Sequence, residues 1–288
     1  QGAFIGAVHR IAARLDNRYE LISGAFSSDP DRALKSAQEI GIAAERSYSD
    51  FKKMAKMEAA RADGIEAVSI VTPNNVHAEA IIAFLEEGIH VICDKPLTIS
   101  SAEAIRIKST VEQASARFFL THNYTAYPLI REARQMVKTG MLGKLRLVQA
   151  EYLQDWLADH LESSGQKQAA WRTDPTATGG GGAIGDIGTH AYNLAYFVTG
   201  LRPNSLAADL STFVEGRLVD DNAHIWLRYP CGAKGQIWTS QVAIGNENNL
   251  KLRIYGDLGG LEWHQEEPNN LWYTQKGGVR QNIRRGST

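Results

Sequence analysis

The chain has 288 residues, of which 43% are hydrophobic and 22% charged, and its formal net charge is -1 at pH 7. This length allows one or two domains with a substantial core, and the composition is that of an ordinary globular protein. The charge balance argues against a general nucleic-acid or anionic-membrane surface, and no apolar run is long enough to cross a bilayer. The two cysteines, Cys93 and Cys231, are far apart in the sequence. We therefore expect no disulfide framework and a cytoplasmic location.

The sequence opens with QGAFIGAVHR, in the middle of a motif. We interpret the first strand of the fold as missing from it. Gly2 and Gly6 fit the tail of a glycine-rich dinucleotide fingerprint, in which glycines let the backbone approach a pyrophosphate at a helix N-terminus. A simple turn before a helix explains the two glycines equally well.

The first part of the chain alternates between helix-like and strand-like segments. Helices are expected over 7–16, 31–41, 77–88 and 101–114, and strands over 19–26, 65–73, 90–93 and 117–123. Such alternation predicts βαβ units around a parallel sheet, the arrangement of a Rossmann fold. Ligands of such sheets bind beyond the carboxyl ends of the strands. The short segments 27–31, 72–75, 94–96 and 121–124 all fall at that edge.

The pattern changes near residues 121–126, where we place a domain boundary. A helix is expected over 127–143 and a long strand over 144–156. After a glycine-rich stretch and one further helix, strands are expected over 221–230, 233–244, 249–256 and 259–263. These strands follow one another without helices between them, which predicts a C-terminal α/β domain with a large, mostly antiparallel open sheet.

Two serines follow the strand 19–26, at the place where an acidic residue usually binds the adenosine ribose. Asp29 lies slightly beyond that place. Ser27, Ser28 and Arg32 are able to surround a ribose 2′-phosphate, with Arg32 supplying charge-assisted hydrogen bonds. A turn followed by a solvated arginine is the alternative, so NAD and NADP both stay open.

The segment Asp94-Lys95-Pro96 follows a buried strand at the ligand edge. Pro96 restricts Lys95 to an extended conformation, which fixes where the ammonium leaves the sheet. A lysine at a strand end is ordinarily just solvated, but this position favours a function.

The stretch 179–200 is the most informative part of the sequence. Four consecutive glycines at 179–182 let the backbone pass close to something flat or bulky, and a helix is expected to begin at 184–186. Asp186 and His190 are four residues apart and so share one helical face. A carboxylate beside an imidazole sets its tautomer and suits proton transfer at neutral pH. An incidental surface pair is the alternative, and no metal is expected, because no third ligand has a clear spacing.

Aromatic and acidic residues gather between residues 155 and 174. They are Asp155, Trp156, Asp159, His160, Trp171, Arg172 and Asp174. Aromatic rings pack on C–H faces and carboxylates accept hydroxyl protons, so this composition suits a polyhydroxylated ligand. Core tryptophans and loop acids give the same pattern.

Several motifs, in this order, resemble the Gfo/Idh/MocA family of sugar and inositol dehydrogenases. They are a dinucleotide-binding half, V-T-P-N-x-x-H at 71–77, D-K-P at 94–96 and G-G-G-x-x-x-D-I-G-T-H at 180–190. The resemblance covers nearly the whole chain. Asp94 replaces the glutamate that the family usually has before the lysine, and Asn193 stands where the family often has an acid.

The resemblance implies an NAD- or NADP-dependent dehydrogenase acting on CH–OH groups. It implies a Rossmann domain over 1–122 and a substrate-binding and oligomerisation domain over 123–288, which often forms dimers or tetramers through its open sheet. The catalytic residues would be Lys95, Asp186 and His190. Expected cofactor contacts are Gly2, Phe4, Ile5, Gly6, Ser27, Ser28, Arg32, Thr72, Pro73, Asn74, His77, Asp94, Lys95, Asn123, Trp171 and Arg172. Expected substrate contacts are Lys95, Tyr124, Trp156, Asp174, Asp186 and His190.

In this interpretation His190 takes the hydroxyl proton, Asp186 orients His190, and the Lys95 ammonium favours negative charge on the reacting oxygen. Two alternatives stay open. One is a redox-neutral sugar-processing enzyme that returns the hydride after elimination or glycoside cleavage. The other is a non-catalytic sensor that binds a nucleotide, although such a sensor has no need of the three catalytic residues.

Overall fold

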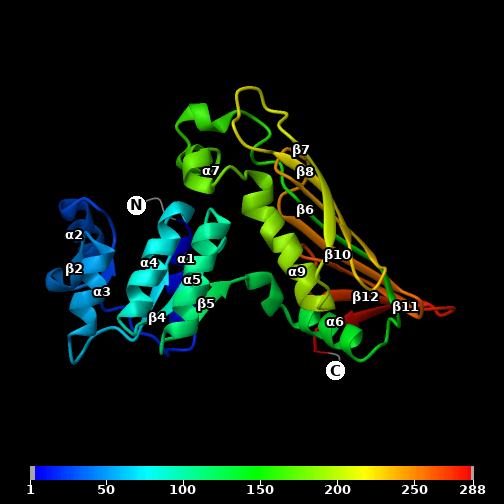
Figure 1. Ribbon diagram of the computed structural model, residues 1–288, viewed down its shortest axis with the longest axis horizontal. Coiled ribbons are helices and arrows are strands. Elements are labelled where there is room, and N and C mark those ends of the chain that lie inside the picture. Colours follow the sequence, from blue (N-terminus) through cyan, green and yellow to red (C-terminus); the bar gives the residue numbers. More distant parts are fainter. Residues whose placement is uncertain (1–3, 287–288) are drawn as a thin grey trace. The chain divides into compact units, whose positions relative to one another are not determined.

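The computed structural model describes residues 4–286 of the chain. The chain divides into two compact units, Gln1–Thr121 and His122–Thr288 (Figure 1). The division lies inside the segment 121–126, where the sequence pattern changes. Among residues 4–286, none of the helices has both the length and the apolar character that a bilayer span requires.

The first unit alternates helices with parallel strands, which confirms the Rossmann-like fold expected from the sequence. Its strands are β1 (Gly24–Ala25), β2 (Ser47–Tyr48), β3 (Ala67–Ile70), β4 (His90–Asp94) and β5 (Phe118–Thr121). Its helices are α1 (Phe4–Arg14), α2 (Pro30–Glu39), α3 (Phe51–Ala59), α4 (Asn74–Glu86) and α5 (Ser101–Gln113), with a 3-10 turn, η1 (Ala44–Arg46). β1 pairs with β2, and β3, β4 and β5 form a second parallel sheet in that order.

The first unit differs from expectation in several places. The strand expected over 19–26 is reduced to β1, and the sequence analysis predicted neither β2 nor α3. The start of α3 carries a local signal, because the Asp50 carboxylate accepts the backbone N–H of Lys52 at 2.7 Å and caps the helix. Inside this unit Arg46 and Glu58 form a buried ion pair, to which Tyr48 donates its hydroxyl at 2.9 Å.

The second unit is built on one eight-stranded sheet. Its strands are β6 (Leu145–Leu153), β7 (Ser205–Ser211), β8 (Asn222–Arg228), β9 (Lys234–Ser240), β10 (Asn249–Gly256), β11 (Gly259–His264), β12 (Asn270–Gln275) and β13 (Arg280–Arg284). They are arranged in the order β13-β12-β11-β10-β6-β9-β8-β7. β6 and β9 pair in parallel, and the other neighbours pair antiparallel. The mostly antiparallel sheet is therefore confirmed, with β7, β12 and β13 as strands that the sequence analysis did not predict.

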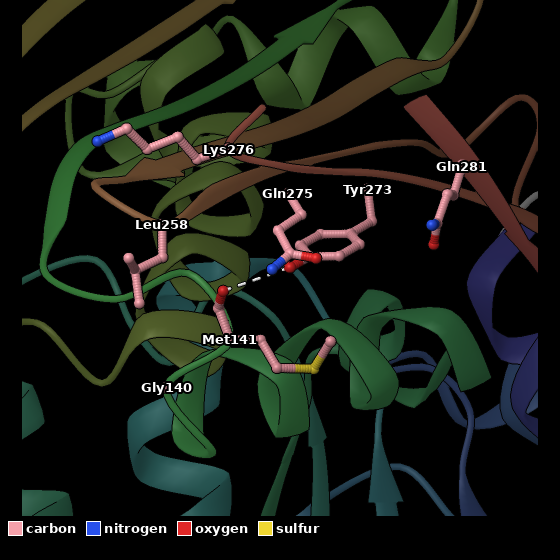
Figure 2. Close-up of a pocket in the computed structure, with 7 residues that line it drawn as sticks. All are labelled: Gly140, Met141, Leu258, Tyr273, Gln275, Lys276 and Gln281. Atoms are coloured by element: carbon pink, nitrogen blue, oxygen red, sulfur yellow. Dashed lines mark hydrogen bonds between the residues drawn. The ribbon is translucent and has the colours of Figure 1, made fainter. Parts of the chain in front are cut away.

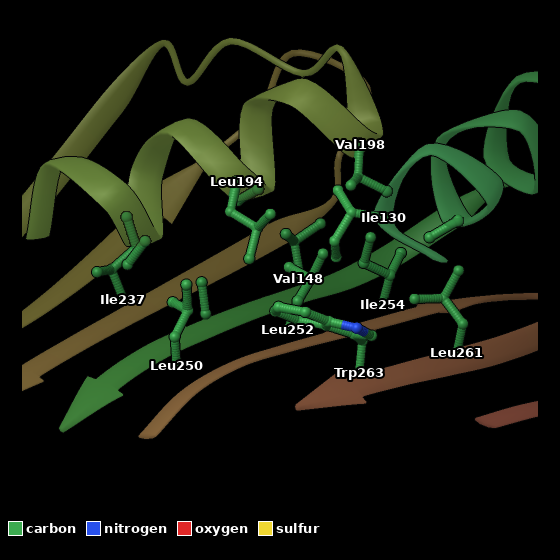
Figure 3. Close-up of a cluster of buried hydrophobic side chains, with 14 of the residues drawn as sticks. Ile130, Val148, Leu194, Val198, Ile237, Leu250, Leu252, Ile254, Leu261 and Trp263 are labelled. Carbon is green, nitrogen blue, oxygen red and sulfur yellow. The ribbon is translucent and has the colours of Figure 1, made fainter. Parts of the chain in front are cut away.

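Two helices, α6 (Pro128–Lys138) and α9 (Thr189–Thr199), cover one face of this sheet (Figure 1). The helical elements of the unit are η2 (Asn123–Ala126), α6 (Pro128–Lys138), η3 (Leu161–Ser164), α7 (Lys167–Arg172), α8 (Pro175–Thr178), the π-helical η4 (Ile184–Gly188) and α9 (Thr189–Thr199). Figure 3 shows Leu194 of α9 and Ile130 of α6 packed over strand residues such as Val148 and Leu252. The opposite face carries polar and aromatic side chains, including Trp226, which is 58% exposed. The core lies on one side, as the alternation along each strand dictates.

Candidate functional site

The predicted cofactor residues of the first unit lie where parallel strands end. Thr72 and Pro73 follow β3 and are exposed, whereas Asn74 opens α4 and is buried. Asp94 is the last residue of β4, and Lys95 follows it directly. Because β3 and β4 are parallel neighbours, their carboxyl ends share one edge of the sheet, where ligands of such sheets bind.

His77 connects the two loops at this edge. Its ring is buried, with Nδ1 2.9 Å from the carbonyl oxygen of Pro96 and Nε2 3.0 Å from that of Thr72. The Lys95–Pro96 peptide bond is cis. The two ring nitrogens of His77 thus face backbone oxygens of the loops that follow β3 and β4. Contact between this ring and a cofactor stays a prediction.

Asp94 is held as a carboxylate beside Lys95. Thr121 Oγ1 donates to Asp94 Oδ1 at 2.7 Å, and His9 Nε2 lies 3.8 Å from the same oxygen. Burial alone would raise the pKa of Asp94, but the hydrogen bonds from His9 and Thr121 and the charge of Lys95 outweigh it and lower the pKa. The edge of the sheet therefore carries a fixed negative charge next to the predicted catalytic lysine. The sequence analysis did not single out His9 or Thr121.

The structure describes only some residues of the glycine-rich dinucleotide fingerprint. Gly2 lies outside the described residues, and Phe4, Ile5 and Gly6 form the first turn of α1. A Cβ added at Gly6 would lie 3.5 Å from Arg10 and 3.6 Å from Val71, which is ordinary contact. The described fold therefore does not itself require glycine at position 6, and its contact with a pyrophosphate stays a prediction.

The residues after β1 form a helix cap. The Asp29 carboxylate accepts the backbone N–H of Arg32 at 2.8 Å and so begins α2, while Ser27 Oγ accepts the N–H of Asp29 at 3.1 Å. The side chains of Ser28 and Arg32 are exposed. These exposed donors suit either a ribose or a ribose phosphate.

In the second unit, the glycine-rich segment passes close to the chain itself. A Cβ added at Gly182 would lie 1.9 Å from the backbone oxygen of Asp220. The Asp220 carboxylate accepts the backbone N–H groups of Gly182 and Ile184 at 2.7 and 2.8 Å. Burial raises the pKa of Asp220 more than these hydrogen bonds lower it. The sequence analysis expected something flat or bulky beside the glycines. At Gly182 this neighbour is the backbone of Asp220.

Asp186 lies in the π-helical turn that Asp220 anchors. The helical segment begins at Ile184, as predicted, but with π rather than α geometry through Gly188. Gln241 Nε2 donates to Asp186 Oδ2 at 3.0 Å, and Arg172 Nε lies 3.4 Å from the same oxygen. The Arg172 guanidinium stacks 4.3 Å above the ring centroid of Trp171. The predicted role of Asp186 in orienting His190 stays a prediction.

His190 lies among aromatic rings at the start of α9. It is 7% exposed, and its ring centroid is 4.8 Å from that of Tyr124 and 6.0 Å from that of Tyr152. The ring of His122 makes an edge contact at 5.9 Å. The low dielectric of such surroundings strengthens any interaction that the imidazole makes with a charge.

A chain of polar side chains leads from these rings toward Asp186. The hydroxyls of Tyr124 and Tyr152 are 2.6 Å apart, and Tyr152 donates to Asn248. Gln154 Nε2 donates to Asn248 Oδ1 at 3.1 Å, and Gln241 Nε2 donates to Gln154 Oε1 at 3.5 Å. Burial raises the pKa of Tyr152 well above its ordinary value, so its hydroxyl stays protonated. Apart from Tyr124, the sequence analysis missed these residues.

The aromatic and acidic residues of 155–174 have different local roles. Trp156 donates its indole N–H to Gln154 Oε1 at 3.1 Å. Asp155 Oδ2 accepts the N–H of Gly245 at 2.9 Å, and Asp174 caps α8. Asp159 and His160 are among the residues that line a depression of about 690 Å³, together with Phe213 and Trp238. Asn123, an expected cofactor contact, is exposed at the start of η2.

A second depression, of about 610 Å³, lies at the end of α6 beside the β12–β13 hairpin (Figure 2). It is lined by Gly140, Met141, Leu258, Tyr273, Gln275, Lys276 and Gln281. Tyr273 donates its hydroxyl to the backbone oxygen of Met141 at 3.4 Å. None of the predicted site residues lines it. Among residues 4–286, no three or more His, Cys, Asp or Glu side chains are grouped so as to hold a metal ion.

Two family models match the sequence. The model "Oxidoreductase family, NAD-binding Rossmann fold" matches residues 2–122, and the model "GFO/IDH/MocA C-terminal domain" matches residues 130–262. The uncharacterized oxidoreductase YfiI of Bacillus subtilis is 36% identical over 288 residues, covering 98% of this chain and 72% of the relative. The levoglucosan dehydrogenase of Pseudarthrobacter phenanthrenivorans is 27% identical, covering 94% of this chain and 73% of the relative.

Solved structures agree with these matches. An inositol dehydrogenase homolog from Azotobacter vinelandii, complexed with NAD+, superimposes with a TM-score of 0.95 at 34% identity and covers 99% of this chain and 74% of that one. The same homolog complexed with NADH and myo-inositol gives a TM-score of 0.91 at 33% identity, covering 99% of this chain and 73% of that one.

Proposed function

The chain belongs to the Gfo/Idh/MocA family of NAD-binding oxidoreductases, and from this premise we propose that it transfers a hydride between a nicotinamide cofactor and a hydroxyl-bearing carbon of a sugar, sugar derivative or inositol. One observation carries the proposal. His190 is buried among tyrosine rings beside the turn that holds Asp186, whose carboxylate accepts a hydrogen bond from Gln241. A buried imidazole that follows a hydrogen-bonded carboxylate by four residues in one helical segment suits a general base.

We propose three roles for the chain's own residues. His190 accepts the proton of the substrate hydroxyl, and Asp186 orients its imidazole. Lys95 donates a hydrogen bond to the reacting oxygen and stabilises the negative charge that develops there. The cofactor, when bound, supplies the hydride chemistry. The support for Lys95 is its position directly beyond β4, with the Asp94 carboxylate as its neighbour.

The residues at the strand ends fit a dinucleotide. Exposed Thr72 and Pro73 follow β3, and Ser28 and Arg32 present exposed donors beyond β1. Parallel sheets bind dinucleotides at this edge. We assign cofactor contacts to Thr72, Pro73, Ser28 and Arg32. Further contacts are assigned to Ser27, Asn74, His77 and Asp94. The first turn of α1, which begins at Phe4, is assigned to the same cofactor. Asn123, Trp171 and Arg172 of the second unit are assigned to the same cofactor.

The second unit carries the substrate preference in this proposal. Tyr124 and Trp156 are aromatic residues of this unit, and Gln154 and Asn248 supply amides that bond to them. This combination matches C–H faces and hydroxyls of a polyol. We assign Tyr124, Trp156 and Asp174 to substrate contact. Relatives with polyol names, such as the levoglucosan dehydrogenase and the myo-inositol 2-dehydrogenase of Thermotoga maritima, 25% identical over 238 residues, support the same class.

We also propose that copies of the chain associate through the sheet face opposite α6 and α9. Trp226 is exposed there, and His224 stacks on Trp238 at 5.3 Å, which is the kind of aromatic surface that interfaces favour.

Cys93 and Cys231 are both free thiols, which is consistent with a reducing cytoplasm.

The test is a polyol screen with NAD and NADP. Myo-inositol, levoglucosan and L-sorbose are incubated with each cofactor, and NADH or NADPH absorbance is followed. The proposal predicts net reduction with at least one polyol, and a preference between the cofactors that calorimetric titration with NADH and NADPH reproduces. Conversion of a polyol without accumulation of reduced cofactor would instead indicate a redox-neutral enzyme. Binding of cofactor with no conversion of any compound would favour the sensor.

A further inference from the structure

Gln241 is a buried residue at the carboxyl end of β9, with a backbone held from two sides. It is 2% exposed. Its N–H donates to the backbone oxygen of Asp221 at 2.8 Å, and its carbonyl oxygen accepts the N–H of Leu157 at 3.1 Å. A backbone fixed in this way leaves the side chain little freedom beyond its own rotamer.

The side-chain amide of Gln241 faces two acceptors. Its Nε2 lies 3.0 Å from Asp186 Oδ2 and 3.5 Å from Gln154 Oε1. An amide nitrogen donates two hydrogen atoms, and here each has an acceptor. Gln154 is fixed in turn, because its own Nε2 donates to Asn248 Oδ1 at 3.1 Å. The Gln241 amide that donates to Asp186 is therefore one of three hydrogen-bonded amides, those of Gln241, Gln154 and Asn248. It is not a mobile surface group.

Two donors of different character serve the same carboxylate oxygen. Arg172 Nε is 3.4 Å from Asp186 Oδ2 and stacks on Trp171, and its side chain is partly exposed. Gln241 is closer and fully enclosed. A buried hydrogen bond to a charged group is stronger and more directional than a partly solvated ion pair. Of these two groups, Gln241 therefore fixes the direction of the Asp186 carboxylate more strongly than Arg172 does.

We propose that Gln241 is a positioning residue for Asp186 in the hydride-transfer reaction. The inference rests on the proposed function, in which Asp186 orients the general base His190. Gln241 touches neither reactant in this account. It holds the carboxylate in the direction that the imidazole needs, and small displacements of catalytic groups are costly in rate.

Two substitutions separate positioning from packing. Gln241→Leu preserves the approximate volume and removes both donors at every pH. Gln241→Glu preserves the shape and, when ionised, places a second carboxylate against Asp186 Oδ2 and Gln154 Oε1. Arg172 from α7 approaches Asp186, Tyr152 from β6 interacts with it electrostatically, and His190 follows it by four residues on α9, while Gln241 itself is uncharged. When the introduced glutamate is protonated, its O–H can donate to Asp186 as the native amide does.

The kinetic experiment compares both variants with wild type on the polyol and cofactor found in the screen. Each variant should lower kcat by about 10- to 100-fold, with the Kd for NADH unchanged. The ratio of Gln241→Glu to wild-type kcat should rise as the pH falls, whereas the Gln241→Leu ratio should not. The matched controls are Gln113→Leu and Gln113→Glu, because Gln113 is an exposed residue at the end of α5 whose Nε2 donates to Ser109 Oγ at 3.2 Å, away from the residues assigned to the site. These controls should keep kcat within about twofold.

A thermal double-mutant cycle tests the pairing without any substrate. Gln241→Leu and Asp186→Ala are measured singly and together, and the melting temperature of the double variant should fall by less than the sum of the single changes. Additive changes, or Gln241 variants with wild-type kcat, would overturn the inference while leaving the proposed function intact. A wild-type protein that oxidises no polyol would overturn the proposed function, and the cycle would still decide whether Gln241 holds Asp186.

Discussion

Replacing Gly182 with alanine should displace the turn that carries Asp186. The added Cβ would lie 1.9 Å from the backbone oxygen of Asp220 and 2.7 Å from Val219 Cγ2. A backbone oxygen cannot rotate away as a side chain can, so one of the two segments must move. The backbone N–H of Asp186 donates to the Gly182 oxygen at 2.9 Å, so the displacement is passed directly to the predicted catalytic residue.

The size of the effect follows from the bonds that must break. The Asp220 carboxylate accepts from the N–H groups of Gly182 and Ile184 at 2.7 and 2.8 Å. Hydrogen bonds to charged groups contribute roughly 1.5–3 kcal/mol each, so losing both would lower the free energy of unfolding by about 3–6 kcal/mol. A shift of about 1 Å at Asp186 would lower kcat by about 100-fold.

Thermal denaturation and steady-state kinetics measure the two effects. The matched control is Gly185→Ala in the same turn, where an added Cβ has no heavy atom within 4 Å. That variant should change the free energy of unfolding by less than about 0.5 kcal/mol. If Gly182→Ala were as stable and as active as Gly185→Ala, the reasoning about the close approach to Asp220 would be wrong.

Three further outcomes are expected. Lys95→Met should lower turnover by about 100- to 1,000-fold with the Kd for NADH unchanged in calorimetry, and near-wild-type turnover would refute the role of Lys95. Arg217→Met should lower the free energy of unfolding by about 3–5 kcal/mol in denaturant titration. The reason is that the carboxylates of Glu162 and Asp221 lose the buried guanidinium that pairs with both. A loss under about 1 kcal/mol would contradict this prediction. Burial alone would raise the pKa of Glu162, but the hydrogen bonds and charge of Arg217 outweigh it and lower this pKa in the folded protein. The pairing therefore stabilises the fold fully above the ordinary glutamate pKa of about 4.3. This stabilisation is lost as the pH falls through the lowered pKa of the folded state. Arg217→Met should therefore reduce the loss of stability on acidification, and an unchanged acid profile would argue against the linkage.

Local sequence signals predicted most of the first unit. The helices expected over 31–41, 77–88 and 101–114 correspond to α2, α4 and α5, and the apolar runs before Thr72 and Asp94 form the parallel strands β3 and β4. The strand over 19–26 was predicted too long, since pairing with β2 involves only Gly24 and Ala25. Strand propensity alone does not determine how many residues find a partner.

The polar surroundings of Asp186 were not predictable from the sequence. Gln154 and Gln241 are 87 residues apart. They approach each other because β6 and β9 pair in parallel with Leu153 opposite Ser240, so that each glutamine follows the end of its strand. Register between distant strands depends on the whole sheet, which local patterns do not encode. Asp186 and His190, by contrast, were proposed as a pair from their spacing within one helical segment, and that pairing stays a prediction.

The close approach at Gly182 shows the same limit. A run of glycines indicates that the backbone approaches something, but it does not say what. The partner is the backbone of Asp220, 38 residues further on, whose carboxylate caps the turn. Only the folded chain identifies it.

Transfer of deuterium from substrate to cofactor tests the central claim most directly. C-deuterated myo-inositol and levoglucosan are incubated with the protein and NAD or NADP, and the reduced cofactor is analysed by mass spectrometry. The account predicts that one polyol yields deuterated NADH or NADPH in wild type and almost none in Lys95→Met. A cofactor that binds but stays oxidised and unlabelled with every polyol would contradict direct hydride transfer.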